Sequence, residues 1–272
     1  MESPFDPLFF DPFLTGAAYA VALPLVGLAL RLRDEWLAAL AFAQISALGA
    51  LLALVFAAPA SLGGLAAAVG AAAVKQAFEG AGKKARGTVY ALLFLFGWGA
   101  SVLLVVNLPI AEHAAHALFD GQLYFTGRTH LVYAFLLTGA LIVFLRLLSR
   151  RLLRAHFFPD FFHARTDVAE ISEKHVVLLF DLAAAVVLAF ATMSVGVMAA
   201  FALLFVPPLI AFAWGRNWRH ATAIAVAVGV AAHLTAFVLA LALDQPYGPL
   251  LGILLIVAAV SGIRRQKTED RR

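Results

Sequence analysis

The sequence predicts an all-α, polytopic membrane protein with about eight or nine transmembrane helices, organised as a single transmembrane domain over residues 1–272. Two observations carry this prediction. First, 63% of the residues are hydrophobic and only 13% are charged, with a mean hydropathy of +0.93, whereas a soluble domain carries about 25% charged residues. Second, apolar segments long enough to cross a bilayer recur along the whole chain.

The apolar segments of spanning length follow one another with short polar connections between them. They cover 13–30, 36–57, 60–74, 88–106, 131–148, 176–193, 195–213, 220–243 and 247–263. The third segment, which contains SLGGLAAAVGAAAV, is short and consists largely of alanine and glycine. We expect such a segment to pack closely against the backbone of a neighbouring helix.

The basic residues predict the orientation of these segments. If all nine cross the membrane and the N-terminus is outside, every Lys and Arg except Arg128 falls on the inner side, as the positive-inside rule requires. Omitting 60–74 would place the basic stretch KQAFEGAGKKAR on the outer face. We therefore predict a multi-pass protein of the plasma (inner) membrane with a cytoplasmic C-terminus. The basic character is a topology signal and does not indicate nucleic-acid binding.

Several functions are disfavoured by the composition and by incomplete motifs. The absence of cysteine excludes disulfides and thiolate metal sites. The stretch GAGKKARG (80–87) resembles a phosphate-binding loop, but Ala77 stands where that motif needs glycine and Ala85 where it needs Ser or Thr.

The N-terminus lacks the basic region of a cleavable signal peptide, so we expect the first apolar segment to be retained. The stretch EHAAH (112–116) has two histidines on one helical face, which could capture a metal ion at the pore entrance. Alternatively, they are exposed imidazoles of an amphipathic outer loop.

Few polar side chains fall inside the predicted spans, and each is a candidate functional residue because such residues are costly in lipid. They are Asp181, His233 and Gln44, with Asp244 at the outer end of the eighth span. Carboxylate and imidazole suit zinc or manganese, so Asp181 and His233 could together bind a divalent cation in transit. Alternatively, Asp181 bonds the backbone of a broken helix, His233 bridges two helices, and Gln44 makes a hydrogen bond between helices.

A helix break is predicted within ATMSVGVMAAFALLFVPPLIAFAWG (191–215). The stretch opens on a polar hinge formed by Thr192, Ser194 and Gly196, and it ends with the pair Pro207 and Pro208 before Arg216. Transporters use discontinuous helices where a cavity or neighbouring protein satisfies the freed backbone groups. We expect this segment to act as a gate, with a purely structural kink as the alternative.

Four stretches resemble a known family, the membrane (permease) subunits of bacterial ABC importers for zinc and manganese, of which this chain looks like a divergent member. SVGVMAAFALLFVPPLIA (194–211) places Pro207 at the signature proline of that family. ALDQPYGPLLGILL (242–255) is similar to its D-x-P-x-G-P segment, and FPDFFHARTDV (158–168) resembles its cytoplasmic coupling stretch. ALFDGQLYFTGRTHL (117–131) is weakly similar to an outer segment of the family.

The resemblance implies a transport subunit that does no covalent chemistry and binds no cofactor itself. It implies three partners: an ATPase subunit that binds ATP on the cytoplasmic side, an extracytoplasmic substrate-binding protein on outer loops that include 107–130, and a second copy of the chain. The ATPase would dock on 155–173, where the expected contacts are Pro159, Asp160, Phe161, Phe162 and His163. A helix lying flat on the membrane surface is the alternative for this segment.

The chain departs from the family at the second span. There the family carries an Asp and, four residues later, a His that line the metal path, whereas this sequence has Leu40 and Gln44. Either Asp181, His233 and Asp244 supply the ligands, or the cargo is not a bare ion. Two rival functions therefore stay open: an ABC permease for a metal chelate or other small solute, and a secondary transporter with Asp181 as its proton carrier. The long inner connection, with its FPDFF segment, disfavours the secondary transporter.

Overall fold

The structure is a computed structural model, and it describes residues 7–78, 82–116, 123–157 and 167–269. Within these residues all regular structure is helical. The elements are α1 (Pro7–Leu32), α2 (Trp36–Val55), α3 (Ala60–Ala77), α4 (Lys83–Asn107), α5 (Pro109–His116), the 3-10 turn η2 (Leu123–Phe125), α6 (Arg128–Phe157), α8 (Asp167–Val195), α9 (Val197–Trp214), α10 (Trp218–Leu243) and α11 (Tyr247–Glu269).

Among the described residues, seven helices are long and apolar enough to cross a membrane, namely α1, α2, α4, α6, α8, α9 and α10. In α11 the apolar stretch Tyr247–Val260 is shorter. This confirms the predicted all-helical, multi-pass architecture. The Ala- and Gly-rich α3 is not one of the seven, because its composition alone does not reach the hydropathy of a spanning helix.

The contacts of α3 show where it runs. Near one end, Gly63 faces Gly49 of α2 so closely that a Cβ on either residue would overlap the main-chain oxygen of the other. Near the other end, Lys75 is paired with Glu35, which precedes α2. The helix α3 is therefore antiparallel to α2 and returns the chain to the end from which α2 started. The small residues permit this close approach, as the sequence predicts.

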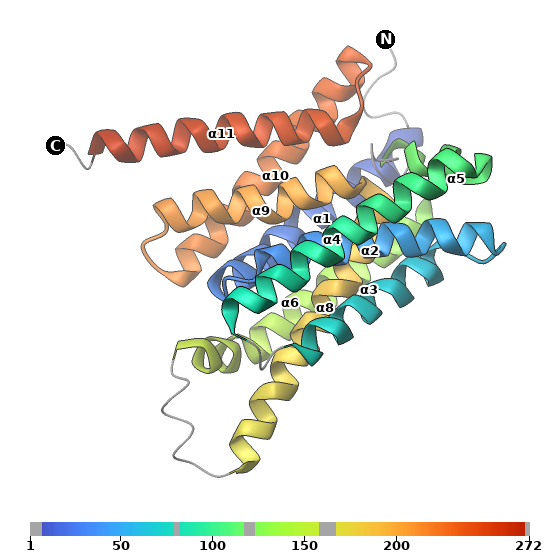
Figure 1. Cartoon of the computed structure of the whole chain (residues 1–272). Helices are drawn as coiled ribbons and strands as arrows, with labels where there is room; N and C mark the ends of the chain where they lie inside the picture. The colour runs from blue at the N-terminus through green and yellow to red at the C-terminus, as the bar shows by residue number, and fades with distance from the viewer. Residues whose placement is uncertain (1–6, 79–81, 117–122, 158–166, 270–272) are drawn as a thin grey trace.

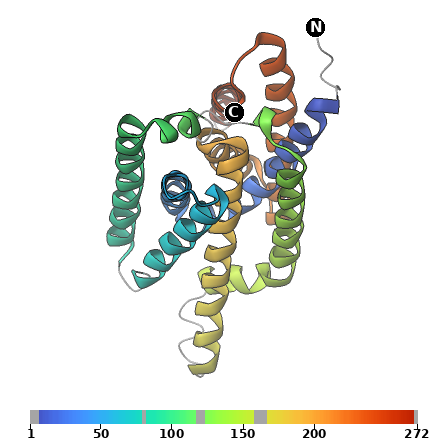
Figure 2. The same ribbon diagram turned by 90° about the vertical axis from the view of Figure 1, so that its right-hand side faces the viewer.

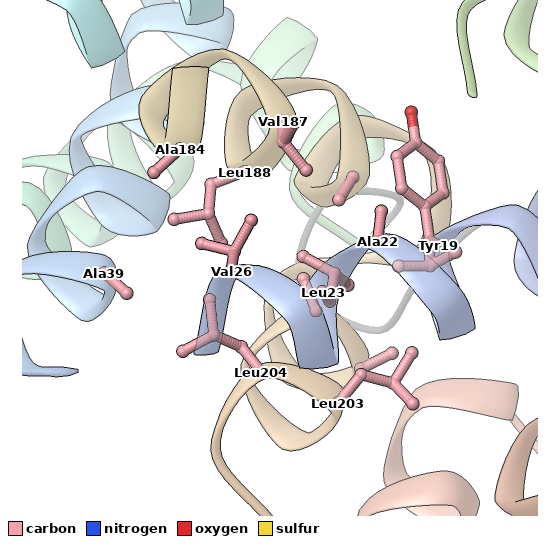
Figure 3. Packing of buried hydrophobic residues seen from close by; sticks show 14 of the residues in the cluster. Tyr19, Ala22, Leu23, Val26, Ala39, Ala184, Val187, Leu188, Leu203 and Leu204 are labelled. Carbon is pink, nitrogen blue, oxygen red and sulfur yellow. The ribbon is translucent and has the colours of Figure 1, made fainter. Parts of the chain in front are cut away.

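The core lies where α1 packs between α8 and α9 (Figure 3). Leu23 and Val26 of α1 lie among Leu188 of α8 and Leu203 and Leu204 of α9. The helices α4 and α6 lie on opposite sides of the bundle (Figure 2), and both expose large apolar side chains along their length. Such surfaces suit lipid acyl chains. The helix α11 packs along α9 at one edge of the bundle (Figure 1).

Candidate functional site

A cluster of buried charges lies at the end of the bundle where α1 ends and α2 begins. Asp181 of α8 is fully buried, and its carboxylate accepts hydrogen bonds from Arg33 Nη1 at 3.0 Å and from Lys75 Nζ. Arg33 follows α1, and Lys75 lies in the last turn of α3. The guanidinium of Arg33 also lies over the ring of Phe180, 5.7 Å from its centroid.

Glu35 is the second carboxylate of this charge cluster. Its oxygens pair with Arg33 Nη2 at 2.8 Å, Lys75 Nζ at 3.3 Å and Arg86 Nη1 at 3.0 Å. Three cations and two carboxylates therefore meet, and the side chains of all but Arg86 are at most 8% exposed. Charges taken out of water persist only where they are paired and hydrogen-bonded. The cluster ties the α1–α2 turn, α3, the start of α4 and α8 together.

Sequence reasoning missed this charge cluster. It identified Asp181 as an intramembrane acid that could bind a cation together with His233, and it counted Arg33, Lys75 and Arg86 only as basic residues of the inner side. A signal was nevertheless present, because two acidic residues, Asp34 and Glu35, directly follow Arg33 in a short connection between two spans. Acidic residues contribute little to topology, so one in that position suggests an ion pair.

Asp181 and His233 do not form a joint metal site in this structure, which corrects the hypothesis of a shared site. The partner of Asp181 is Arg33, beyond the C-terminal end of α1, whereas the imidazole of His233 bonds the main-chain oxygen of Phe13, near the start of that helix. At 1.5 Å per residue the two partners are about 30 Å apart. Within the described residues, no three His, Asp or Glu side chains gather as a metal-binding group.

His233 instead joins α10 to both α1 and α11, one helix more than the bridge between two helices considered above. Its Nε2 donates to the oxygen of Phe13 at 3.1 Å, because a carbonyl can only accept, and its Nδ1 accepts from the hydroxyl of Tyr247 at 2.8 Å. Gly16 of α1 lies against the ring, and a Cβ there would overlap Cε1. Tyr247 belongs to the DQPYGP stretch at the start of α11, so this stretch positions the partner of the histidine.

Asp244 and Gln44 lie apart from both of these sites. Asp244 is exposed and ends α10 in a left-handed conformation with φ 53°, where its N–H bonds the oxygen of Ala240. Gln44 is buried in α2 against Gly97 of α4. In the described part of the chain its Oε1 has no hydrogen-bond partner, and neither does the hydroxyl of Ser101, one turn beyond Gly97. Gln44 therefore makes no hydrogen bond between helices through this oxygen.

The predicted helix break lies where the sequence places it. A single residue, Gly196, separates α8 from α9, and its φ of 87° and ψ of 160° belong to a region that is essentially restricted to glycine. The helix α9 continues through Pro207 and Pro208. Pro208 cannot donate to the oxygen of Leu204, and Gly27 of α1 lies against that oxygen. The proposed ATPase contacts at 159–163 lie outside the described residues.

These features define a multi-pass membrane protein with a helix break of the kind that transport proteins use. Residues 6–265 match the sequence profile of the ABC 3 transport family. The chain belongs to this family and is a permease subunit, not an enzyme. Among curated protein sequences none matches it significantly.

Two solved structures share the fold. PsaBC from Streptococcus pneumoniae, in complex with Fab, matches with a TM-score of 0.76 and 15% identity over 95% of this chain and 91% of that chain. An inward-facing transporter, described as being of the metal-chelate ABC type, matches with a TM-score of 0.75 and 16% identity. The match covers 96% of this chain and 86% of that chain. At these identities the likeness establishes the fold.

Proposed function

We propose that the chain is the permease subunit of an ATP-driven importer that moves a divalent metal ion, zinc or manganese, inward across the plasma membrane by alternating access. The observation that carries the proposal is the family match over residues 6–265. The fold shared with PsaBC supports it. In this proposal the N-terminus is outside and the C-terminus cytoplasmic, and the partners are an ABC ATPase that binds ATP, an extracytoplasmic binding protein and a second copy.

The proposed coupling route runs along α8. The proposed ATPase contacts at 159–163 come shortly before α8 begins at Asp167, and the helix then continues to the break at Gly196. Asp181 fixes the inner half of α8 to the charge cluster through Arg33 and Lys75. A displacement of the inner end of α8 by the ATPase would therefore act on both the charge cluster and the Gly196 corner.

The gate of the proposed mechanism is α9. Its inner half carries Pro207 and Pro208, and it packs on α1 at the contact of Gly27 with Leu204. Because Pro208 supplies no hydrogen bond to Leu204, the backbone there is held by neighbouring packing more than by the helix ladder. That arrangement allows α9 to bend when α8 moves.

Gln44 is the first of the proposed pathway residues. It lies one turn from Leu40, at the position where the resemblance expects a metal-binding histidine, and in the described residues its Oε1 is unpartnered. Asp244, exposed at the outer end of α10, is proposed to meet cargo where it enters. Asp181 and His233 could bind cargo only if their present hydrogen bonds open.

A second candidate cargo, a metal chelate or another small solute, is favoured by Leu40 and Gln44. A leucine offers no ligand and a glutamine only a neutral oxygen, whereas a chelated metal arrives with its own ligands. A secondary transporter with Asp181 as proton carrier is disfavoured, because each proton transfer would have to disrupt the ion pairs with Arg33 and Lys75.

The test is to reconstitute the permease with its ATPase in vesicles and measure ATP-dependent accumulation of zinc, manganese, iron and cobalt. Accumulation of one metal, lost with a hydrolysis-deficient ATPase and insensitive to an uncoupler, supports the proposal. The double substitution Leu40→Asp/Gln44→His should then increase accumulation of the free ion. If no metal accumulates although the ATPase is active, the cargo is a chelate or another solute; uptake without the ATPase would overturn an ABC mechanism.

A further inference from the structure

A groove opens between α6 and α10, with α1 as its floor. Its volume is about 660 Å³, within the range of about 300–1,000 Å³ of small-molecule sites. The lining is mainly apolar and includes Val21, Leu25 and Leu32 of α1, Ile142 and Leu145 of α6, and Val226 of α10. Both α6 and α10 pack on α1. The groove belongs to neither the charge cluster around Asp181 nor the His233 site.

The length of the groove matches one leaflet of a bilayer. Along α1 the lining runs from Val21 to Leu32, which at 1.5 Å per residue is about 16 Å. Half of a hydrocarbon core is about 15 Å. Leu32 is next to Arg33, at the end of the bundle that the basic residues predict to be cytoplasmic. The groove therefore extends from the inner surface of the membrane to about its middle.

Two unpaired cations flank the groove. Arg146 of α6 and Arg219 of α10 both line it and are exposed. In the described part of the chain neither has an ion-pair or hydrogen-bond partner. Two other arginines of the same end have partners: Arg86 pairs with Glu35, and Arg31 lies over the ring of Phe212. Trp218, at the start of α10, also lines the groove, and tryptophan favours the depth of lipid headgroups.

We propose that this groove binds an anionic phospholipid of the inner leaflet, with an acyl chain along α1 and the phosphate between Arg146 and Arg219. The apolar lining, the one-leaflet length and the two unpaired cations together match the parts of such a lipid. A second copy of the chain fits less well. A two-fold interface is self-complementary, and among the described residues that line the groove no acidic side chain could pair with the arginines of another copy.

The test is native mass spectrometry of the purified permease with dioleoyl-phosphatidylglycerol or dioleoyl-phosphatidylcholine. The wild type should retain the anionic lipid in preference to the zwitterionic one. Arg146→Gln/Arg219→Gln should weaken phosphatidylglycerol binding by about five-fold for each arginine. The matched control is Lys84→Gln, which removes an exposed cation from the start of α4 and should leave binding unchanged. Equal binding of phosphatidylglycerol by wild type and double variant would overturn the proposal.

A second variant tests the groove itself. Thr222→Phe places an aromatic ring at a half-buried groove position and should reduce retention of phosphatidylglycerol even with both arginines present. A thermal melt checks that the variant is folded. If the variant instead loses dimers while its phosphatidylglycerol binding is unchanged, a second copy covers the groove and the lipid proposal is wrong.

Discussion

Gly27 of α1 lies directly against the main-chain oxygen of Leu204 in α9. A Cβ at position 27 would overlap that oxygen and would lie 2.9 Å from Cγ of Pro208. Pro208 comes four residues after Leu204 and has no N–H to donate, so the helix leaves this oxygen without its usual partner. The proline frees the carbonyl, and the glycine allows α1 to approach it. The two residues thus make one contact between the first helix and the proposed gate.

Gly27→Ala should destabilise the permease by about 1–3 kcal/mol, because the new methyl group forces α1 and α9 apart in a packed core. Thermal unfolding in detergent measures the effect. Gly99→Ala is the matched control: it also replaces a helical glycine, but no atom lies within 4 Å of the added Cβ, so its stability should be equal or higher. Equal melting temperatures for the two variants would contradict the close contact.

Pro208→Ala tests whether the proline pair has a dynamic role. Alanine restores the donor to the oxygen of Leu204, so we expect α9 to become stiffer, with the melting temperature maintained or raised and ATP-driven uptake lowered several-fold. Uptake assays on vesicles with equal amounts of reconstituted protein measure this. Unchanged uptake would mean that the prolines make only a structural kink.

Gly196→Ala should cost about 1–3 kcal/mol, since φ 87° and ψ 160° are strained for any residue with a Cβ. We expect a lower melting temperature together with reduced uptake, because the corner between α8 and α9 must rearrange. Gly139→Ala, on α6 and with open space around the added Cβ, serves as the control. A Gly196→Ala variant as stable and active as the wild type would show that the corner tolerates another conformation.

Asp181→Asn should lower stability by about 3–5 kcal/mol, because it removes a buried carboxylate that pairs with both Lys75 and Arg33. The burial of Asp181 in an apolar span, considered alone, predicts instead that this variant assembles normally and has reduced transport. A double-mutant cycle with Lys75→Met separates the two effects, and the paired variant should recover part of the lost stability. A single variant with a normal melting temperature but no uptake would instead support a pathway role for Asp181.

Tyr247→Phe removes the hydroxyl that donates to Nδ1 of His233 and leaves that nitrogen buried without a donor. The expected cost is about 1–3 kcal/mol, read from thermal unfolding. Tyr133→Phe on the exposed face of α6 is the control and should be neutral. If Tyr247→Phe is equally neutral, the hydrogen bond does not anchor α11.

The course of the chain through the membrane could be predicted from the sequence. The predicted segment 36–57 corresponds to α2 (Trp36–Val55) and 220–243 to α10 (Trp218–Leu243). The helix break at Gly196 was also predictable. These features depend on the transfer of a short segment into lipid and on local backbone preferences, so they can be read from neighbouring residues. The composition of α3 is only weak evidence for a membrane span. Its presence was nevertheless predicted, because counting it as a span places the basic connections on one side of the membrane.

Only the tertiary structure decides which side chains meet. Asp181 pairs with Arg33 and Lys75, which are 148 and 106 residues away in the chain, and it is separated from His233 by the length of α1. Hydropathy reports the cost of placing a residue in lipid and says nothing of its neighbours. Ion pairs and hydrogen bonds depend on which helix faces pack together. The sequence therefore determined the helices and their order. Helix packing determined that Asp181 is paired with two cations and that, among the described residues, the side-chain oxygen of Gln44 has no hydrogen-bond partner.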